Sequence, residues 1–281
     1  MNFFMFLFVT SAVFGNGSIF TPMDAEEYLI DRVEHGNEWR RIHAAEGLIE
    51  AGRQQKKISE IFLLEYQKSQ ENSPWRVGCL RVLYQVLPAY RLRYRAEISK
   101  IALCPWHEGA AHAVETMVKL KLVITGKEEN IFKEYAKNND LLGSYALMSL
   151  AVNGDSVALA KLQSRMIAGD PTAVFGFFYI DHLPPEVVSG LVAVSEDDHI
   201  DPVCRALAFR ARAYQNCYND NERKQLLRAL KAEVNPVAIR FYLLTVGDFR
   251  DEDNQKELMP YWLTGNEIYQ IAVARGILNA K

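Results

Sequence analysis

The sequence predicts an all-α protein, built as an α-α superhelix of about eight helical hairpins. Two observations lead to this prediction. A signal for the start of a helix recurs along the chain at a period of roughly 30 to 36 residues. No window shows the alternation of apolar and polar residues that is typical of a strand. The composition is that of an ordinary folded chain, with 49% hydrophobic and 24% charged residues among 281.

The start signals place a short polar residue where a helix is expected to begin. Five copies include proline: Ser73-Pro74, Cys104-Pro105, Asp170-Pro171, Asp201-Pro202 and Asn235-Pro236. Three copies lack proline: Asn37-Glu38-Trp39, Asn139-Asp140-Leu141 and Gly265-Asn266-Glu267. The side chain of Ser, Asp or Asn accepts hydrogen bonds from free N–H groups, and proline is tolerated in the first turn. Only Cys104 departs from this chemistry.

Each start is followed by an apolar helix, which we expect to pair with a more amphipathic one. The apolar helices contain many alanines, such as Ala206, Ala208 and Ala213, so that neighbouring helices can approach closely. The amphipathic helices are expected at Asp24–Glu34, Lys56–Lys68, Arg91–Leu103, Glu186–Ser195 and Asn221–Ala232. Glycine-containing turns, such as Ala51-Gly52, are expected to close the hairpins.

Two segments carry a resemblance to a known repeat. They are Trp39-Arg40-Arg41-Ile42-His43-Ala44-Ala45-Glu46-Gly47-Leu48-Ile49, followed by Gly52, and Asp201-Pro202-Val203-Cys204-Arg205-Ala206-Leu207-Ala208. They resemble the HEAT-repeat superfamily, in a short bacterial form similar to phycobilisome-lyase HEAT-like repeats. The resemblance implies an armadillo-like solenoid over residues 18–281, whose stacked hairpins present a curved, extended binding surface. It also implies an adaptor or scaffold, and less often a lyase or lyase subunit.

The first residues differ from the rest of the chain. The apolar run 3–14 is too short to cross a bilayer, which takes about 20 residues. Small residues follow it at 15–18, as signal peptidase requires, although no Lys or Arg precedes it. We interpret 1–17 as the signal peptide of an exported protein, periplasmic or secreted, with a buried first helix as the alternative. No later run reaches membrane-spanning length, so we expect no membrane span in the mature chain.

Several classes of function are disfavoured. The net charge of −3 argues against a dedicated nucleic-acid-binding protein. The sequence contains no Gly-rich phosphate loop, nucleophile elbow or Cys-x-x-Cys pair. His107 and His112 are five residues apart and therefore point about 140° away from each other on a helix, whereas zinc ligands of the His-Glu-x-x-His type lie on one face. We therefore expect no catalytic residue, no metal and no cofactor.

Some polar and sulfur-containing residues are expected to have structural roles. We interpret His43, in the first apolar helix, as a packed histidine that is hydrogen-bonded to a neighbour. Export would permit disulfides, and Cys79 and Cys104 fall on neighbouring repeats. Buried free thiols are nevertheless the preferred interpretation. The apolar ending 271–278 is expected to expose hydrophobic surface for dimerisation or docking.

Three successive repeats place a tryptophan before a basic or titratable residue near a helix start: Trp39-Arg40, Trp75-Arg76 and Trp106-His107. Equivalent positions in stacked hairpins lie side by side, so we expect these pairs to form a ladder along one edge. Tryptophan faces stack on sugar rings or cations, and arginine matches the geometry of carboxylate or sulfate. A packing role in the core between repeats is the alternative.

The charge is distributed unevenly along the chain. The segment 68–100 is basic and includes Arg91, Arg93 and Arg95, whereas 181–201 is acidic, and such fields can orient a partner. The sequence thus predicts a non-catalytic interaction or scaffold protein that binds a protein partner through a solenoid face, with the ladder and these arginines as contacts. The first alternative is an accessory protein that binds an anionic glycan or another polyanion, and the second is a lyase-like enzyme subunit.

Overall fold

A computed structural model of the protein describes residues 20–215, 219–249 and 254–279. In these residues the chain forms sixteen α-helices and two short 3-10 helices, without a strand. The all-α class is therefore confirmed, and the helices pack in neighbouring pairs as in a helical solenoid. The expected signal peptide, 1–17, and Cys217 lie outside the described residues.

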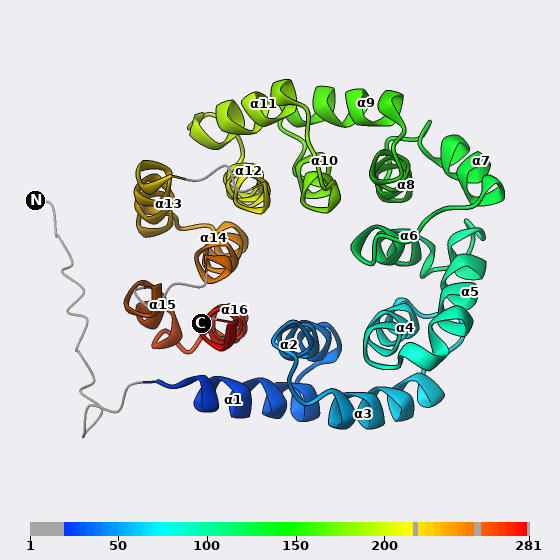
Figure 1. Ribbon diagram of the computed structural model, residues 1–281, viewed down its shortest axis with the longest axis horizontal. Coiled ribbons are helices and arrows are strands. Elements are labelled where there is room, and N and C mark those ends of the chain that lie inside the picture. The colour runs from blue at the N-terminus through cyan, green and yellow to red at the C-terminus, as the bar shows by residue number, and fades with distance from the viewer. Residues whose placement is uncertain (1–19, 216–218, 250–253, 280–281) are drawn as a thin grey trace, which may run out of the picture.

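The helices form an outer and an inner layer (Figure 1). The outer layer holds α1 (Pro22–His35), α3 (Gln55–Lys68), α5 (Arg91–Ala102), α7 (Gly126–Tyr135), α9 (Ser156–Ile167), α11 (Pro185–Glu196), α13 (Asp220–Ala232) and α15 (Asn254–Trp262). The inner layer holds α2 (Glu38–Glu50), α4 (Pro74–Val86), α6 (Ala110–Lys119), α8 (Leu141–Val152), α10 (Pro171–Gly176), α12 (Pro202–Tyr214), α14 (Pro236–Asp248) and α16 (Glu267–Asn279). The 3-10 helix η1 (Pro88–Tyr90) precedes α5, and η2 (Phe177–Tyr179) continues α10.

The predicted start signals begin inner helices, with one exception. The side chains that accept hydrogen bonds from first-turn N–H groups are those of Asn37, Ser73, Asp140, Asp170, Asp201, Asn235 and Asn266. The prediction at Cys104 is wrong, because α6 begins only at Ala110. A thiol is a weak acceptor, so Cys104 does not cap a helix and the chain turns at 104–109 instead.

The inner helices form a closed ring. Each inner helix contacts the next along the chain, and α16 in turn packs against α1 and α2. Figure 1 shows the inner helices nearly end-on around a common centre, with α1 and α3 outside them in side view. The expectation of an exposed apolar end is therefore wrong. The first hairpin covers α16, and the α16 residues Ile271, Val273 and Ile277 are buried.

Small residues allow the inner helices to pack closely. Ala206 and Ala208 of α12 are fully buried, as the alanine content predicted. Where α14 meets α16, a Cβ atom added to Gly247 would lie only 2.5 Å from the Cα atom of Gly276. Among the described cysteines, Cys79, Cys104 and Cys204 are free thiols, and only Cys104 is not fully buried. No helix in the described ranges combines the length and apolar character needed to cross a bilayer.

Candidate functional site in the centre of the ring

Two adjoining hollows lie inside the ring of inner helices. One has a volume of about 370 Å³ and includes residues near the starts of these helices, such as Trp39 and Thr172. The other has a volume of about 270 Å³ and includes residues near their ends, such as Glu50 and Tyr214. The residues that line both hollows are His43, Arg81, Lys119, Phe175, Arg240 and Phe241. The two hollows together are here called the central cavity.

Every inner helix contributes to the central cavity. The α8 helix contributes Tyr145, and α16 contributes Arg275. Repetition explains this convergence, because equivalent positions of successive hairpins face the same side of a solenoid. Glu46 and Arg210, for example, occupy equivalent positions when counted from the N-caps of α2 and α12. Closing the ring turns this concave side into the wall of a cavity.

A chain of ion pairs crosses one side of the cavity, from α2 through α4 to α6. Arg81, only 2% exposed, lies with Nε 2.8 Å from a Glu46 oxygen and with Nη1 3.8 Å from a Glu115 oxygen. The Nζ atom of Lys119 lies 2.8 Å from the other Glu115 oxygen. Two cations therefore face two carboxylates in this chain, and their charges balance.

These partners determine the protonation of the buried acids. Burial raises the pKa of Glu46, but Arg81, the hydrogen bond with His43 and Lys119 together outweigh burial and hold this pKa well below its usual value. For Glu115, Lys119, His112 and Arg81 likewise outweigh burial, so its net pKa is also lowered. His43 lies with Nδ1 3.3 Å from Glu46, yet burial lowers its pKa to about 4. At neutral pH the two acids are ionised and His43 is neutral.

Three arginines lie on the other side of the cavity, on α12, α14 and α16. Arg210 pairs with Asp248 at 3.3 Å, and Arg275 pairs with Glu50. Arg240 lies within ion-pair distance of no carboxylate among the described residues, and its guanidinium is 5.7 Å from the ring centroid of Phe241. Burial and the charge of Arg210 lower the pKa of Arg240 to about 10. Among the described residues, Arg240 is thus a cation without an ion-pair partner.

Aromatic side chains complete the wall. Lys119 Nζ lies 5.6 Å from the ring centroid of Phe175, and the Arg210 guanidinium lies 5.4 Å from that of Phe178. Burial raises the pKa values of the Tyr145 and Tyr179 hydroxyl groups, so both remain protonated and able to donate a hydrogen bond. The central cavity therefore offers cationic groups, hydroxyl donors and flat apolar surfaces to one enclosed space.

The predicted tryptophan ladder is not one exposed row. Trp39 is half-buried at the cavity, with its ring centroid 4.9 Å from that of His112. Trp75 is only 8% exposed and packs on Phe62, at a centroid distance of 6.1 Å. Trp106 is 86% exposed, in the turn that precedes α6. The delayed start of α6 explains the difference, because Trp106 does not occupy the first turn of an inner helix.

The basic members of the ladder also have separate environments. Arg40 forms an ion pair with Glu267 of α16. Arg76 lies 4.0 Å over the Tyr66 ring and pairs with Glu97 at 2.9 Å. Arg76 and His107 nevertheless line one pocket of about 670 Å³, together with Glu71, Asn72, Ala96, Glu97, Lys100, Ile101 and Cys104. The structure thus brings these two predicted residues together beside the exposed Trp106.

The arginines of α5 do not form a single site either. The Arg91 guanidinium lies over the Tyr84 ring at 5.5 Å, whereas Arg95 pairs with Glu128 at 3.1 Å. Arg93 is exposed. A role for these residues and for the tryptophan ladder in binding stays a prediction.

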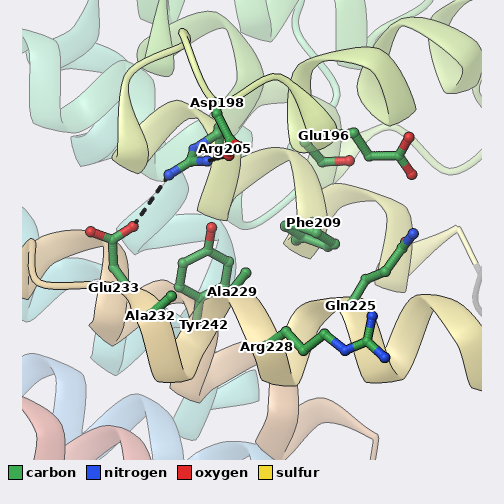
Figure 2. A pocket seen from close by; sticks show the side chains of 11 residues that line it. Glu196, Asp198, Arg205, Phe209, Gln225, Arg228, Ala229, Ala232, Glu233 and Tyr242 are labelled. Carbon is green, nitrogen blue, oxygen red and sulfur yellow. Dashed lines mark hydrogen bonds and ion pairs between the residues drawn. The ribbon is translucent and has the colours of Figure 1, made fainter.

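A further pocket lies between α11, α12, α13 and α14, with a volume of about 480 Å³. Figure 2 shows Arg228 and Gln225 along one edge of this pocket and the phenol ring of Tyr242 near its middle. Arg205, drawn above them, lies 3.7 Å from Glu233 and also pairs with Asp198. This pocket thus contains an arginine whose charge is already compensated.

The charged residues of the central cavity are absent from the sites predicted from sequence. A signal exists for two of them, because Arg240 and Arg275 are isolated charged residues within apolar stretches of α14 and α16. In the described part of the chain, no group of three or more His, Cys, Asp or Glu could hold a metal ion. Comparisons with known protein families, with curated proteins and with solved structures find no match.

Proposed function

We propose that this protein is a non-catalytic binding protein of HEAT-like hairpins, exported as 1–17 suggests, that holds a ligand in its central cavity. The convergence of ionisable and aromatic side chains from all eight inner helices carries this proposal. Burying ion pairs is expensive, and apolar residues of similar size often stabilise a fold as well or better. Charges such as Arg81 and Arg240 are therefore better explained by a ligand than by stability.

The ionisation of the cavity favours binding over catalysis. A general acid needs a proton near neutral pH, but the lowered pKa values of Glu46 and Glu115 keep both ionised. The same residues are engaged by Arg81 and Lys119. Neither acid is therefore placed to donate a proton at neutral pH, and an enzyme subunit is the less favoured candidate.

The dimensions of the cavity favour a small ligand over a folded partner. Hollows of about 270 and 370 Å³ match the lower end of the range for small-molecule sites. A protein partner would instead contact the outside of the ring. The exposed Trp106, beside the pocket of Arg76 and His107, is the specific observation that favours this second candidate, with a protein or an anionic glycan as the ligand.

Blocking one opening of the cavity tests the proposal. Ligands would first be found by thermal-shift screening of neutral, anionic and cationic small molecules, and their affinities then measured by calorimetry. Thr172→Trp, at the start of α10, should obstruct the cavity and abolish binding. Val157→Trp, on the exposed face of α9, is the matched control and should bind normally. Equal binding by both variants would place the ligand elsewhere and refute the proposal.

A further inference from the structure

We infer that the ligand of the central cavity is a small organic anion whose carboxylate is bound by Arg240. This inference rests on the proposed function and adds the chemical class of the ligand. It also assigns a role to one cation among the six that line the cavity, Arg81, Lys119, Lys121, Arg210, Arg240 and Arg275.

The charge balance of the cavity singles out Arg240. Arg81 and Lys119 face the two carboxylates Glu46 and Glu115. Arg210 and Arg275 are each paired, with Asp248 and Glu50 respectively, and Lys121 is paired with Asp181. His43, which lies near Arg240, is neutral at physiological pH. One positive charge therefore remains, and it belongs to Arg240.

The surroundings of Arg240 make this charge a receptor for an anion. Burial removes part of the hydration of the Arg240 guanidinium. The like charges of Arg210 and Arg275 further disfavour its charged form. A guanidinium carries five N–H donors in a planar fork that matches a carboxylate through two parallel hydrogen bonds. No hydrogen bond from Arg240 to another described residue occupies these donors. A bound carboxylate would supply both the missing counter-charge and the missing acceptors.

Neighbouring side chains indicate the body of the ligand. Phe175 and Phe241 line both hollows together with Arg240, and Tyr179 lines one of them. Flat apolar rings beside a cationic fork suit an aromatic or sugar ring that bears a carboxylate. The larger hollow, of about 370 Å³, lies within the range of about 300 to 1,000 Å³ that is typical of small-molecule sites and therefore has room for such a ring. The expected ligands are thus aromatic acids and sugar acids.

The inference can be tested first on the unmodified protein. The probes are benzoate, glucuronate and a short peptide with a free carboxyl terminus, each compared with its neutral amide by calorimetry. The acids should bind roughly 10- to 100-fold more tightly than their amides, because only the acids pair with the guanidinium. Binding of benzoate or glucuronate indicates a free metabolite as the source, and selective binding of the peptide acid indicates the chain terminus of a partner.

Variants then assign the effect to Arg240. Arg240→Gln should remove the preference for acid over amide, and Arg240→Lys should retain part of it. Arg228 is exposed and lies outside the central cavity, so the control Arg228→Gln should leave the preference unchanged. An equal affinity of acid and amide for the unmodified protein would overturn the inference, as would an unaltered preference in Arg240→Gln. If neutral compounds bind as well as acids and Thr172→Trp blocks their binding, the assignment of Arg240 fails but the proposed function of the cavity stands. If no bound compound responds to Thr172→Trp, the proposed function fails as well.

Discussion

Arg40 in the first inner helix forms an ion pair with Glu267 at the start of the last one, although 227 positions separate them. Glu267 also accepts a hydrogen bond of 3.1 Å from Arg32 of α1. Nearby, Tyr28 donates to Gln270, and its ring packs on Trp262. These contacts join the two ends of the described chain and make the ring a closed structure whose inner face is a cavity.

Close packing of glycines in the ring should make Gly276→Ala strongly destabilising. The added Cβ atom would lie 2.8 Å from the Cα atom of Gly247, which as backbone cannot move aside without separating α14 from α16. We expect a loss of about 1–3 kcal/mol in the free energy of unfolding, measured by urea denaturation. Gly126→Ala is the control, because no atom lies within 4 Å of its added Cβ atom. Equal stability of the two variants would contradict the described packing.

Removing Arg81 should leave the Glu46 carboxylate without its cationic partner in the cavity wall, whereas Glu115 keeps Lys119. Arg81→Met is therefore expected to lower the free energy of unfolding by about 3–5 kcal/mol at pH 7. Without Arg81, burial would dominate and raise the pKa of Glu46 above its value in the unfolded chain. The deficit should then narrow as the pH falls from 7 towards 4.5, because the buried acid takes up a proton.

Denaturation curves at several pH values check this prediction. The control is Arg93→Met on the exposed face of α5, which should change stability by less than about 0.5 kcal/mol. A deficit in Arg81→Met that does not depend on pH would mean that Glu46 is not an unpaired buried acid in that variant.

His43 should make the protein less stable in mild acid. Its folded pKa of about 4 lies below the ordinary histidine pKa of 6.5, so between these values only the unfolded chain takes up a proton. The contribution of neutral His43 to the free energy of unfolding is fully present above pH 6.5 and is lost as the pH falls to about 4. Since the side chain is 29% exposed, we expect a loss of about 1–3 kcal/mol.

Comparison with His43→Gln isolates this effect from other titrating groups. The stability difference between the unmodified protein and His43→Gln should change over this pH window, whereas His199→Gln, exposed after α11, should follow the unmodified protein throughout. Parallel curves for all three proteins would argue that His43 is protonated in the folded state.

The tryptophans of the predicted ladder should behave differently in solution. Trp106→Phe should remove the fluorescence that acrylamide quenches most readily and leave stability within about 0.5 kcal/mol, because the ring is 86% exposed. Trp75→Ala should cost about 3–5 kcal/mol, because this ring is buried against Phe62. Similar quenching of Trp75 and Trp106 would restore the ladder as an exposed surface.

Local sequence signals predicted most of the helices, because each depends on a few neighbouring residues. The N-cap Asp201 and the following proline place the start of α12 without reference to the rest of the chain. Cys104-Pro105 resembles such a start through its proline alone, because the thiol is a poor cap, and the chain turns at 104–109 instead. Trp106 therefore lies in this turn and not in the first turn of an inner helix.

The closed ring and its cavity depend on distant residues and could not be predicted in this way. Closure results from small rotations between successive hairpins that accumulate until Glu267 meets Arg40. Arg210 and Arg240 are separated in the sequence and become neighbours of Arg275 only when the inner helices surround one space. In an open solenoid these three arginines would not face one another, so no local pattern in the sequence groups them.

A cysteine cross-link between α2 and α16 distinguishes a closed ring from an open solenoid. A Cβ atom placed on Gly47 of α2 lies 3.4 Å from the Cβ atom of Arg275 of α16, close to the separation found in disulfides. The double variant Gly47→Cys, Arg275→Cys should therefore oxidise within one molecule, and mass spectrometry should identify a peptide that links the first repeat to the last. Either single variant should give no such peptide. Free thiols or only intermolecular dimers in the double variant would show that α2 and α16 do not meet and that the solenoid is open.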